Sequence, residues 1–236
     1  MKAVFFDAGG TLIHVDYERV ARVLERVLGR SFSPEAFVEA DYAGRDAVEA
    51  AMGGGMHGTD DDRWTVHFRA MLGALGVTGE EFGAAGPAIA EEHRKKHLWT
   101  ATRPGTAEGL ETLRRHGLFV AVISNADGTV EQLLAEAGLR QHLEFVVDSA
   151  VVGVEKPDPR IFEIALERSG IAPREAWYVG DMYPVDVVGA RGAGLEPVLL
   201  DPLGRYAGRD CRTATDVPTF CRELVPPSRR HRFPAP

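Results

Sequence analysis

Short apolar runs alternate with helical segments of about ten residues through the second half of the chain. These runs occupy residues 118–123, 145–147, 177–179 and 197–200. Strands that alternate with helices in this way indicate βαβ units, in which parallel strands are covered by helices. A fifth run, at residues 3–6, ends in Asp7 and the pair Gly9-Gly10, which is typical of a buried strand followed by a tight turn. We therefore expect an α/β fold, with a parallel sheet flanked by helices.

Residues 15–98 separate the first apolar run from the others and show helical patterns but no convincing strand. Apolar residues recur at helical spacing before Gly29, and both Ser33-Pro34-Glu35 and the aspartates at 60–62 are typical of helix N-termini. The first strand can join the sheet only if this helical block is an insertion. We expect a core of residues 1–14 and 100–203, an all-helical cap of residues 15–99, and a C-terminal segment of residues 204–236 with a flexible tail.

The charge balance argues against several classes of partner. The 27 basic and 35 acidic residues leave a net charge of −8, whereas binding to nucleic acid or to an anionic membrane depends on clustered Lys and Arg. No apolar run approaches the roughly 20 residues of a membrane span or forms the core of a signal peptide. Cys211 and Cys221 fit a reducing cytosol. We expect a cytoplasmic protein, a monomer or a homodimer, with no nucleic-acid or membrane partner.

Polar side chains follow each predicted strand, at the edge where parallel sheets bind their ligands. They are Asp7, Gly9 and Thr11 after the first strand, Ser124 and Asn125 after the second, Lys156 one loop after the third, and Asp181 and Asp186 after the fourth. Any one of them could simply cap a helix. Together they bring carboxylates, a lysine and hydroxyl groups to one edge of the sheet, which indicates a single site.

These residue types suit the transfer of a phosphoryl group. The carboxylate of Asp7 can act as a nucleophile and form an aspartyl-phosphate that water then hydrolyses. Because phosphate and carboxylate repel each other, a cation must lie between them, and Mg²⁺ prefers hard oxygen ligands. We expect Asp7, Asp181, Asp186 and the carbonyl of Gly9 to bind Mg²⁺. We expect Lys156 to neutralise the phosphoryl group and Thr11, Ser124 and Asn125 to bind it, in a small phosphorylated substrate.

Four segments, in order, resemble the sequence motifs of the haloacid dehalogenase superfamily. They are FFDAGGTL at 5–12, ISN at 123–125, KPDPRIF at 156–162 and GDMYPVDVVGARGAG at 180–194. The resemblance implies a Rossmann-like core and a helical cap inserted after the first motif. It also implies a nucleophile and Mg²⁺ ligand at Asp7, phosphate binding by Ser124 and Lys156, and a metal site completed by Asp181 with support from Asp186.

One position departs from the pattern of the superfamily's phosphatases. They usually carry a second Asp two residues after the nucleophile, as the general acid for the leaving group, and this chain has Gly9 there. General acid catalysis is typically worth about 10²–10⁴ in rate. Three explanations remain open: a good leaving group such as an acyl or aryl phosphate, another acid such as His14 or Asp16, or a weak enzyme or binding module.

Two other functions remain as alternatives. Haloacid dehalogenases of the superfamily also lack this second Asp and need no metal, but the pair Gly180-Asp181 predicts a cation site that their chemistry does not require. A catalytically silent binding or regulatory protein is the other alternative, against which the retention of Asp7, Lys156 and Asp181 argues.

The cap gives weaker signals. The Gly-rich stretch at 53–58 is either a plain linker or a loop that gates the substrate. Tyr17, Arg45 and His57 could face the cleft, although a surface salt bridge is the favoured interpretation of Arg45. The pair His93 and His97 lies on a charged stretch, so we do not predict a zinc site there.

Overall fold

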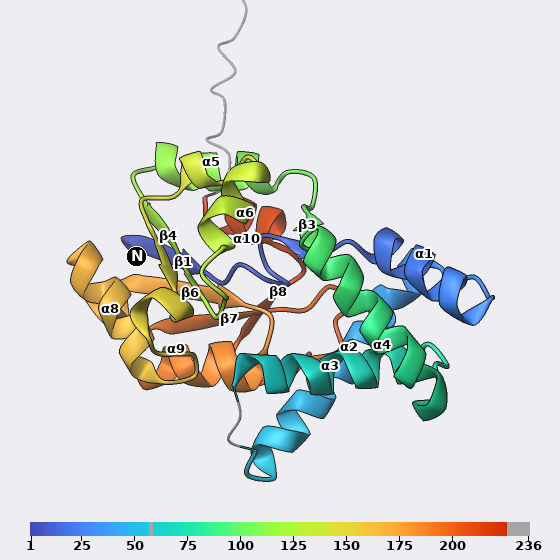
Figure 1. The fold of residues 1–236 in the computed structure, drawn as a ribbon. Helices are drawn as coiled ribbons and strands as arrows, with labels where there is room; N and C mark the ends of the chain where they lie inside the picture. The colour runs from blue at the N-terminus through green and yellow to red at the C-terminus, as the bar shows by residue number, and fades with distance from the viewer. Residues whose placement is uncertain (57–58, 226–236) are drawn as a thin grey trace, which may run out of the picture.

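The computed structural model describes residues 1–56 and 59–225. Its core is a six-stranded sheet in the order β5-β4-β1-β6-β7-β8, and every neighbouring pair is parallel (Figure 1). The strands are β1 Ala3–Phe6, β4 Phe119–Ser124, β5 Val146–Asp148, β6 Ala176–Gly180, β7 Glu196–Leu200 and β8 Arg212–Ala214. The expectation of an α/β fold with a Rossmann-like core is confirmed.

Helices cover both faces of this sheet because the central strands are apolar on both sides. In β1, Val4 and Phe6 point into one hydrophobic cluster, and Ala3 and Phe5 point into the other. The first cluster is closed by α5 Thr106–Arg115, α6 Val130–Glu136 and α10 Val217–Leu224. The second is closed by α8 Pro159–Ser169 and α9 Val188–Gly192. Shorter helices are α7 Ser149–Val152, η1 Arg140–His142, η2 Pro173–Glu175 and η3 Tyr183–Val187.

Four helices between β1 and β4 pack around a separate hydrophobic cluster beside the sheet (Figure 1). They are α1 Tyr17–Leu28, α2 Pro34–Gly53, α3 Asp60–Ala74 and α4 Gly79–Lys95. Capping boxes begin α3 and α4, where Thr59 pairs with Asp62 and Thr78 pairs with Glu81. The helix N-terminus expected at residues 60–62 is therefore present.

The structure contains four elements that the sequence did not predict. An antiparallel pair, β2 His14–Val15 and β3 Trp99–Ala101, joins the two ends of the helical block, so the expectation of an all-helical segment over residues 15–99 is wrong at both ends. Two or three residues are too few to show an alternating pattern. The sheet also continues past residue 203 into β8, and α10 follows it.

Some expectations fall on residues outside the described ranges. Residues 57–58 of the Gly-rich stretch, including His57, and residues 226–236 of the predicted flexible tail belong to this group. Among the described residues, no helix combines the length and the apolar character needed to cross a membrane.

Helix α2 is bound to the core along its length. Tyr42 donates a buried hydrogen bond from its hydroxyl group to Asp201 Oδ1 at 2.7 Å and accepts one from the backbone N–H of Leu203 at 2.9 Å. Further links from the same helix to residues 205–209 are Glu39 with Arg205, Asp46 with Tyr206, and Glu49 with Arg209. The helix therefore cannot move away from the core without breaking buried polar contacts.

We predict that Tyr42→Phe lowers the free energy of unfolding by about 1–3 kcal/mol, because it removes a buried hydrogen bond to the Asp201 carboxyl group and the acceptor of the Leu203 backbone N–H. Tyr183→Phe is the matched control, since Tyr183 makes the same kind of bond to Asp210 but in an exposed position. We expect less than about 0.5 kcal/mol for this control in chemical denaturation. Equal losses in the two variants would contradict the prediction.

Candidate active site

The centre of the site is the buried ammonium group of Lys156, which is 2% exposed. Its Nζ donates hydrogen bonds to Asp7 Oδ1 at 2.6 Å, Asp186 Oδ1 at 2.8 Å and the hydroxyl oxygen of Tyr178 at 2.9 Å. An ammonium group has three N–H bonds, so each of them has an acceptor. These contacts hold the loops after β1, β5 and β6 together around one positive charge.

Asp186 fixes the loop after β6. Its Oδ2 accepts hydrogen bonds from the backbone N–H groups of Asp181 at 3.0 Å and Met182 at 2.9 Å, and its Oδ1 accepts from Lys156. The backbone bonds close a turn that begins at the end of β6. Both oxygens of Asp186 are therefore already engaged, which suits a supporting role in the site.

Asp181 contacts a cation from the helical block. The Nη2 atom of Arg45, on α2, lies 3.3 Å from Asp181 Oδ2, and its Nη1 donates to the carbonyl oxygens of Asp181 at 2.9 Å and Leu200 at 3.2 Å. Its Nε donates to Asp41 at 2.6 Å. Arg45 is only 7% exposed. The expectation of a surface salt bridge is therefore wrong, because the helical pattern of α2 does not reveal which polar face lies against the core.

The three carboxylates lie close enough to share a cation. Asp7, Asp181 and Asp186 each offer an oxygen atom within 4.8 Å of the others, and this is the only such group of His, Cys, Asp or Glu found among the described residues. Carboxylate oxygens are the ligands that Mg²⁺ prefers. Gly10 makes this packing possible, because a Cβ atom there would collide with the Asp181 carboxylate and its φ of +75° favours glycine.

The electrostatics of the cluster show a shortage of positive charge. Burial raises the pKa of Asp7 to about 6 and raises the pKa of Asp181 above its usual range. Although burial opposes it, the carboxylates of Asp186 and Asp7 raise the pKa of Lys156. Lys156 and Arg45 supply two positive charges against three carboxylates. A divalent cation fits this site, because it would favour the ionised form of the two acids that burial disfavours.

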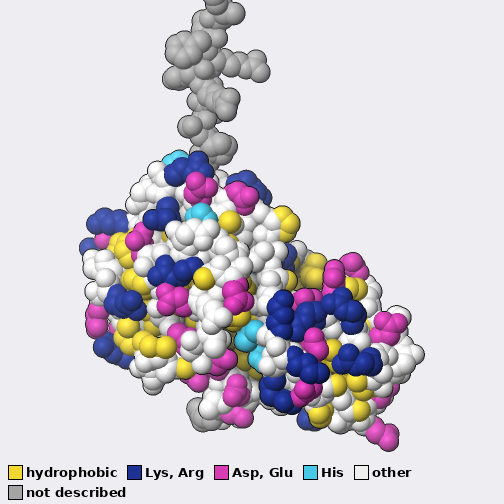
Figure 2. Space-filling model, turned by 45° about the horizontal axis from the view of Figure 1, so that its top comes forward, with side chains coloured by type: hydrophobic (Ala, Val, Ile, Leu, Met, Phe, Trp, Pro, Cys, Tyr) yellow, Lys and Arg dark blue, Asp and Glu magenta, His cyan; other side chains and the backbone are white. Residues whose placement is uncertain are grey.

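Ser124 and Asn125 end β4 beside the lysine. Asn125 Oδ1 accepts a hydrogen bond from the backbone N–H of Lys156 at 2.7 Å, and its Nδ2 donates to the Lys156 carbonyl at 3.1 Å. Asn125 thus holds the main chain of Lys156 in place. Ser124 and Asn125 line a cleft of about 830 Å³ between the core and helices α3 and α4. Figure 2 shows His side chains near this junction, beside a group of Lys and Arg.

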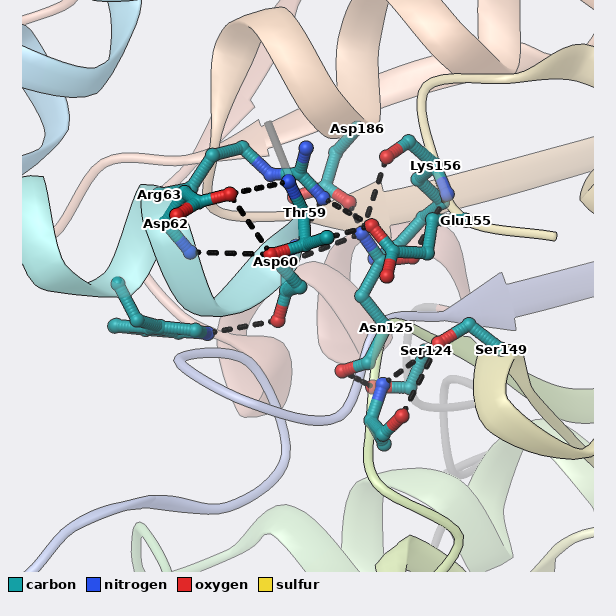
Figure 3. Close-up of polar contacts among 12 residues, drawn as sticks. Thr59, Asp60, Asp62, Arg63, Ser124, Asn125, Ser149, Glu155, Lys156 and Asp186 are labelled. Atoms are coloured by element: carbon teal, nitrogen blue, oxygen red, sulfur yellow. Dashed lines mark hydrogen bonds and ion pairs between the residues drawn. The ribbon is translucent and has the colours of Figure 1, made fainter. Parts of the chain in front are cut away.

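The N-terminus of α3 contacts the site directly, which the sequence did not reveal (Figure 3). Asp60 Oδ1 accepts hydrogen bonds from Asn125 Nδ2 at 3.1 Å and from Arg63 at 3.2 Å. Arg63 also donates to Glu155 at 2.8 Å, and Glu155 accepts from the backbone N–H of Asp60 at 3.0 Å. The sequence identified Asp60 only as part of a helix start; the facing Asn125 and Glu155 are too distant in sequence to be linked with it.

The remaining predicted residues lie around this centre. Thr11 is buried, and its hydroxyl group has no hydrogen-bond partner. Asp16 caps α1 by accepting from the backbone N–H of Arg19 at 2.9 Å. His14 lines a smaller cavity next to Asp181, where burial and the charge of Arg103 lower its pKa to about 3. His14 is therefore neutral near pH 7, so it does not carry the proton that a general acid would donate as imidazolium.

The comparisons with known proteins all indicate the same family. A model of the haloacid dehalogenase-like hydrolases matches residues 1–194. The chain is 39% identical over 134 residues to haloacid dehalogenase-like hydrolase domain-containing protein 3 of Mus musculus, which covers 56% of this chain and about half of that protein's length. It is 30% identical over 225 residues to the glyceraldehyde 3-phosphate phosphatase of Methanopyrus kandleri, which covers 93% of this chain and 92% of that protein.

Solved structures share the fold. The L-2-haloacid dehalogenase of Xanthobacter autotrophicus matches with a TM-score of 0.59 and 23% identity, covering 95% of this chain and 98% of that one. At this level of identity the likeness shows the fold alone. It does not separate a phosphatase from a dehalogenase.

The raised pKa of Asp7 gives a prediction about stability without metal. An Asp that titrates near pH 6 in the fold, instead of its usual 3.8, costs stability as the pH rises from about 4 through 6. We predict that, in excess chelator, the free energy of unfolding of Asp7→Asn relative to that of the wild type rises by about 1–3 kcal/mol between pH 4 and pH 8.

Denaturation at a series of pH values measures this difference. Asp210→Asn is the control, because Asp210 is outside the cluster and its hydrogen bonds with Tyr183 and Arg191 lower its pKa. We expect no such rise in this control. A relative stability of Asp7→Asn that does not rise between pH 4 and pH 8 would show that the buried cluster is not short of positive charge.

Proposed function

The chain belongs to the haloacid dehalogenase-like hydrolases, and we propose that it is a Mg²⁺-dependent phosphatase that attacks a small phosphorylated molecule through Asp7. The observation that carries this proposal is the group of Asp7, Asp181 and Asp186 around Lys156 at the carboxyl end of the sheet. The relative from Methanopyrus kandleri, which matches nearly the whole chain, is named as a phosphatase.

Each residue would have a defined task in this reaction. A carboxylate oxygen of Asp7 forms a bond to phosphorus while the ester P–O bond breaks. Water then attacks the phosphorus atom, so that inorganic phosphate leaves and the carboxylate of Asp7 is restored. Lys156 holds Asp7 ionised and compensates the charge of the phosphoryl oxygens. Ser124 would bind one of these oxygens, a role that its position in the lining of the cleft supports.

Asp7, Asp181 and the carbonyl oxygen of Gly9 would hold Mg²⁺, and Asp186 would support them. The ion supplies positive charge between the substrate and the acidic residues. The protein's own part is to keep the two acids within reach of each other and to fix Asp181 through Arg45. The division into a core and a helical cap belongs to this proposal as well, with α1–α4 closing over the phosphate.

The acidic cluster also favours a phosphatase over the two alternatives. A dehalogenase would need the carboxylate of Asp7 but not a second buried acid in Asp181 beside it. A silent scaffold would gain nothing from two buried carboxylates whose pKa values are raised by burial.

We predict that Asp7→Asn lowers kcat on phosphate esters by at least about 10³-fold, because the amide cannot act as the nucleophile. The measurement is phosphate release from a panel of small phosphorylated metabolites with Mg²⁺. Asp210→Asn, the same change at an exposed residue outside the cluster, should retain wild-type turnover. Full activity in Asp7→Asn would refute the proposed nucleophile.

A second prediction separates the enzyme from its alternatives. Beryllofluoride with Mg²⁺, which imitates a phosphoryl group on a carboxylate, should raise the melting temperature of the wild type but not of Asp7→Asn. Excess chelator should abolish phosphate release. Hydrolysis of a 2-haloacid that persists after metal removal would favour a dehalogenase, and no effect of beryllofluoride would favour a silent scaffold.

A further inference from the structure

The side chain of Trp99 closes the space beside Gly9. A Cβ atom built on Gly9 would lie 3.2 Å from Cζ3 of Trp99 and 3.5 Å from both Cε3 and Cη2. The first of these distances is tighter than ordinary van der Waals contact, so a side chain at position 9 requires the indole ring to move. Trp99 lies on β3, at the junction with the helical block. An aromatic face therefore borders the backbone two residues after Asp7, where a carboxyl group would otherwise project.

Two nearby titratable side chains are poor substitutes for the missing acid. Asp60 accepts hydrogen bonds from Asn125, Arg63 and Trp64, at 3.1, 3.2 and 3.0 Å, so both of its carboxylate oxygens are already engaged by protein donors. His14 is neutral near pH 7 because burial lowers its pKa to about 3. Neither residue is arranged to give a proton to a departing alkoxide.

The cleft next to Gly9 is lined by aromatic rings. Trp64 and Trp99 meet edge to face, with centroids 4.6 Å apart, and Phe68 lies 5.9 Å from Trp64. All three are half-buried and line the cleft, together with Gly9 and Ser124. Aromatic side chains favour aromatic ligands through such offset and edge-to-face contacts. The cleft thus offers an apolar, aromatic wall close to the expected position of the phosphoryl group.

We propose that the substrate is an aryl phosphate, a phosphate ester of an aromatic hydroxyl group whose ring lies against Trp64 and Trp99. This inference rests on the phosphatase activity proposed above. Asp7 forms its bond to phosphorus, the P–O bond to the ring oxygen breaks, and the electron pair leaves with a phenolate. The phenolate is stable without a proton from the enzyme and takes one from solvent afterwards. An aryl phosphate therefore fits both features of the site: its ring contacts the aromatic side chains, and its leaving group needs no general acid.

Three probes separate the ring from the leaving group. Phenyl phosphate has both an aromatic ring and a good leaving group, benzyl phosphate keeps the ring but releases an alkoxide, and acetyl phosphate releases a good leaving group without a ring. We expect kcat/KM for phenyl phosphate to exceed that for benzyl phosphate by at least about 100-fold, the range that a general acid supplies. We also expect it to exceed that for acetyl phosphate.

Variants test the aromatic surface. Trp64→Leu should lower the ratio of kcat/KM for phenyl phosphate to that for acetyl phosphate by about 3- to 10-fold. Trp177→Leu is the matched control, since Trp177 lies on β6, packs against Phe220 of α10 and does not line the cleft. This control should leave the ratio unchanged, even if it lowers stability.

A double variant tests the missing acid. Trp99→Ala makes room beside position 9, and adding Gly9→Asp should then raise kcat/KM for benzyl phosphate at least about tenfold above that of Trp99→Ala alone. Two results would overturn this inference alone. One is a wild-type kcat/KM for benzyl phosphate within threefold of that for phenyl phosphate. The other is a ratio of kcat/KM for phenyl phosphate to that for acetyl phosphate that Trp64→Leu leaves unchanged. No turnover of any probe beyond that of Asp7→Asn would overturn the proposed phosphatase itself.

Discussion

The site depends on one buried positive charge. The ammonium group of Lys156 binds Asp7 and Asp186 from separate loops, and without it two buried carboxylates would face each other with no positive charge between them. It also connects three strands of the sheet, because Asp7 follows β1, Lys156 itself comes after β5, and its third acceptor, Tyr178, lies on β6. The geometry of the centre therefore follows from satisfying one buried cation. The acids that remain undercompensated, Asp7 and Asp181, are those that the proposed reaction uses.

The helical block takes part in this centre at two places. Arg45 of α2 reaches the carboxylate of Asp181, and Asp60 of α3 binds Asn125, which in turn holds the main chain of Lys156. The first contact is buried and is supported by further links along α2. The second is only partly buried, between two residues that line the cleft. A movement of the block that admits substrate would thus break the contact of Asp60 more readily than that of Arg45.

The sequence revealed the α/β core and the grouping of Asp7, Lys156, Asp181 and Asp186, because strand ends of a parallel sheet necessarily meet at one edge. It did not reveal β2, β3 or β8, whose two or three residues carry no period. Arg45 and Asp60 were interpreted as ordinary surface groups of helices, since their partners are far away in sequence. Trp99 was not identified at all; only its contact with Gly9 gives it meaning.

The central claim is that Asp7 and Asp181 form a place for one divalent cation beside Lys156. Calorimetric titration of Mg²⁺ into the full chain tests it directly. We predict one site per chain in the wild type and in Asp210→Asn, and loss of that site in both Asp7→Asn and Asp181→Asn. Binding of Mg²⁺ to the two latter variants with the affinity of the wild type would contradict the claim.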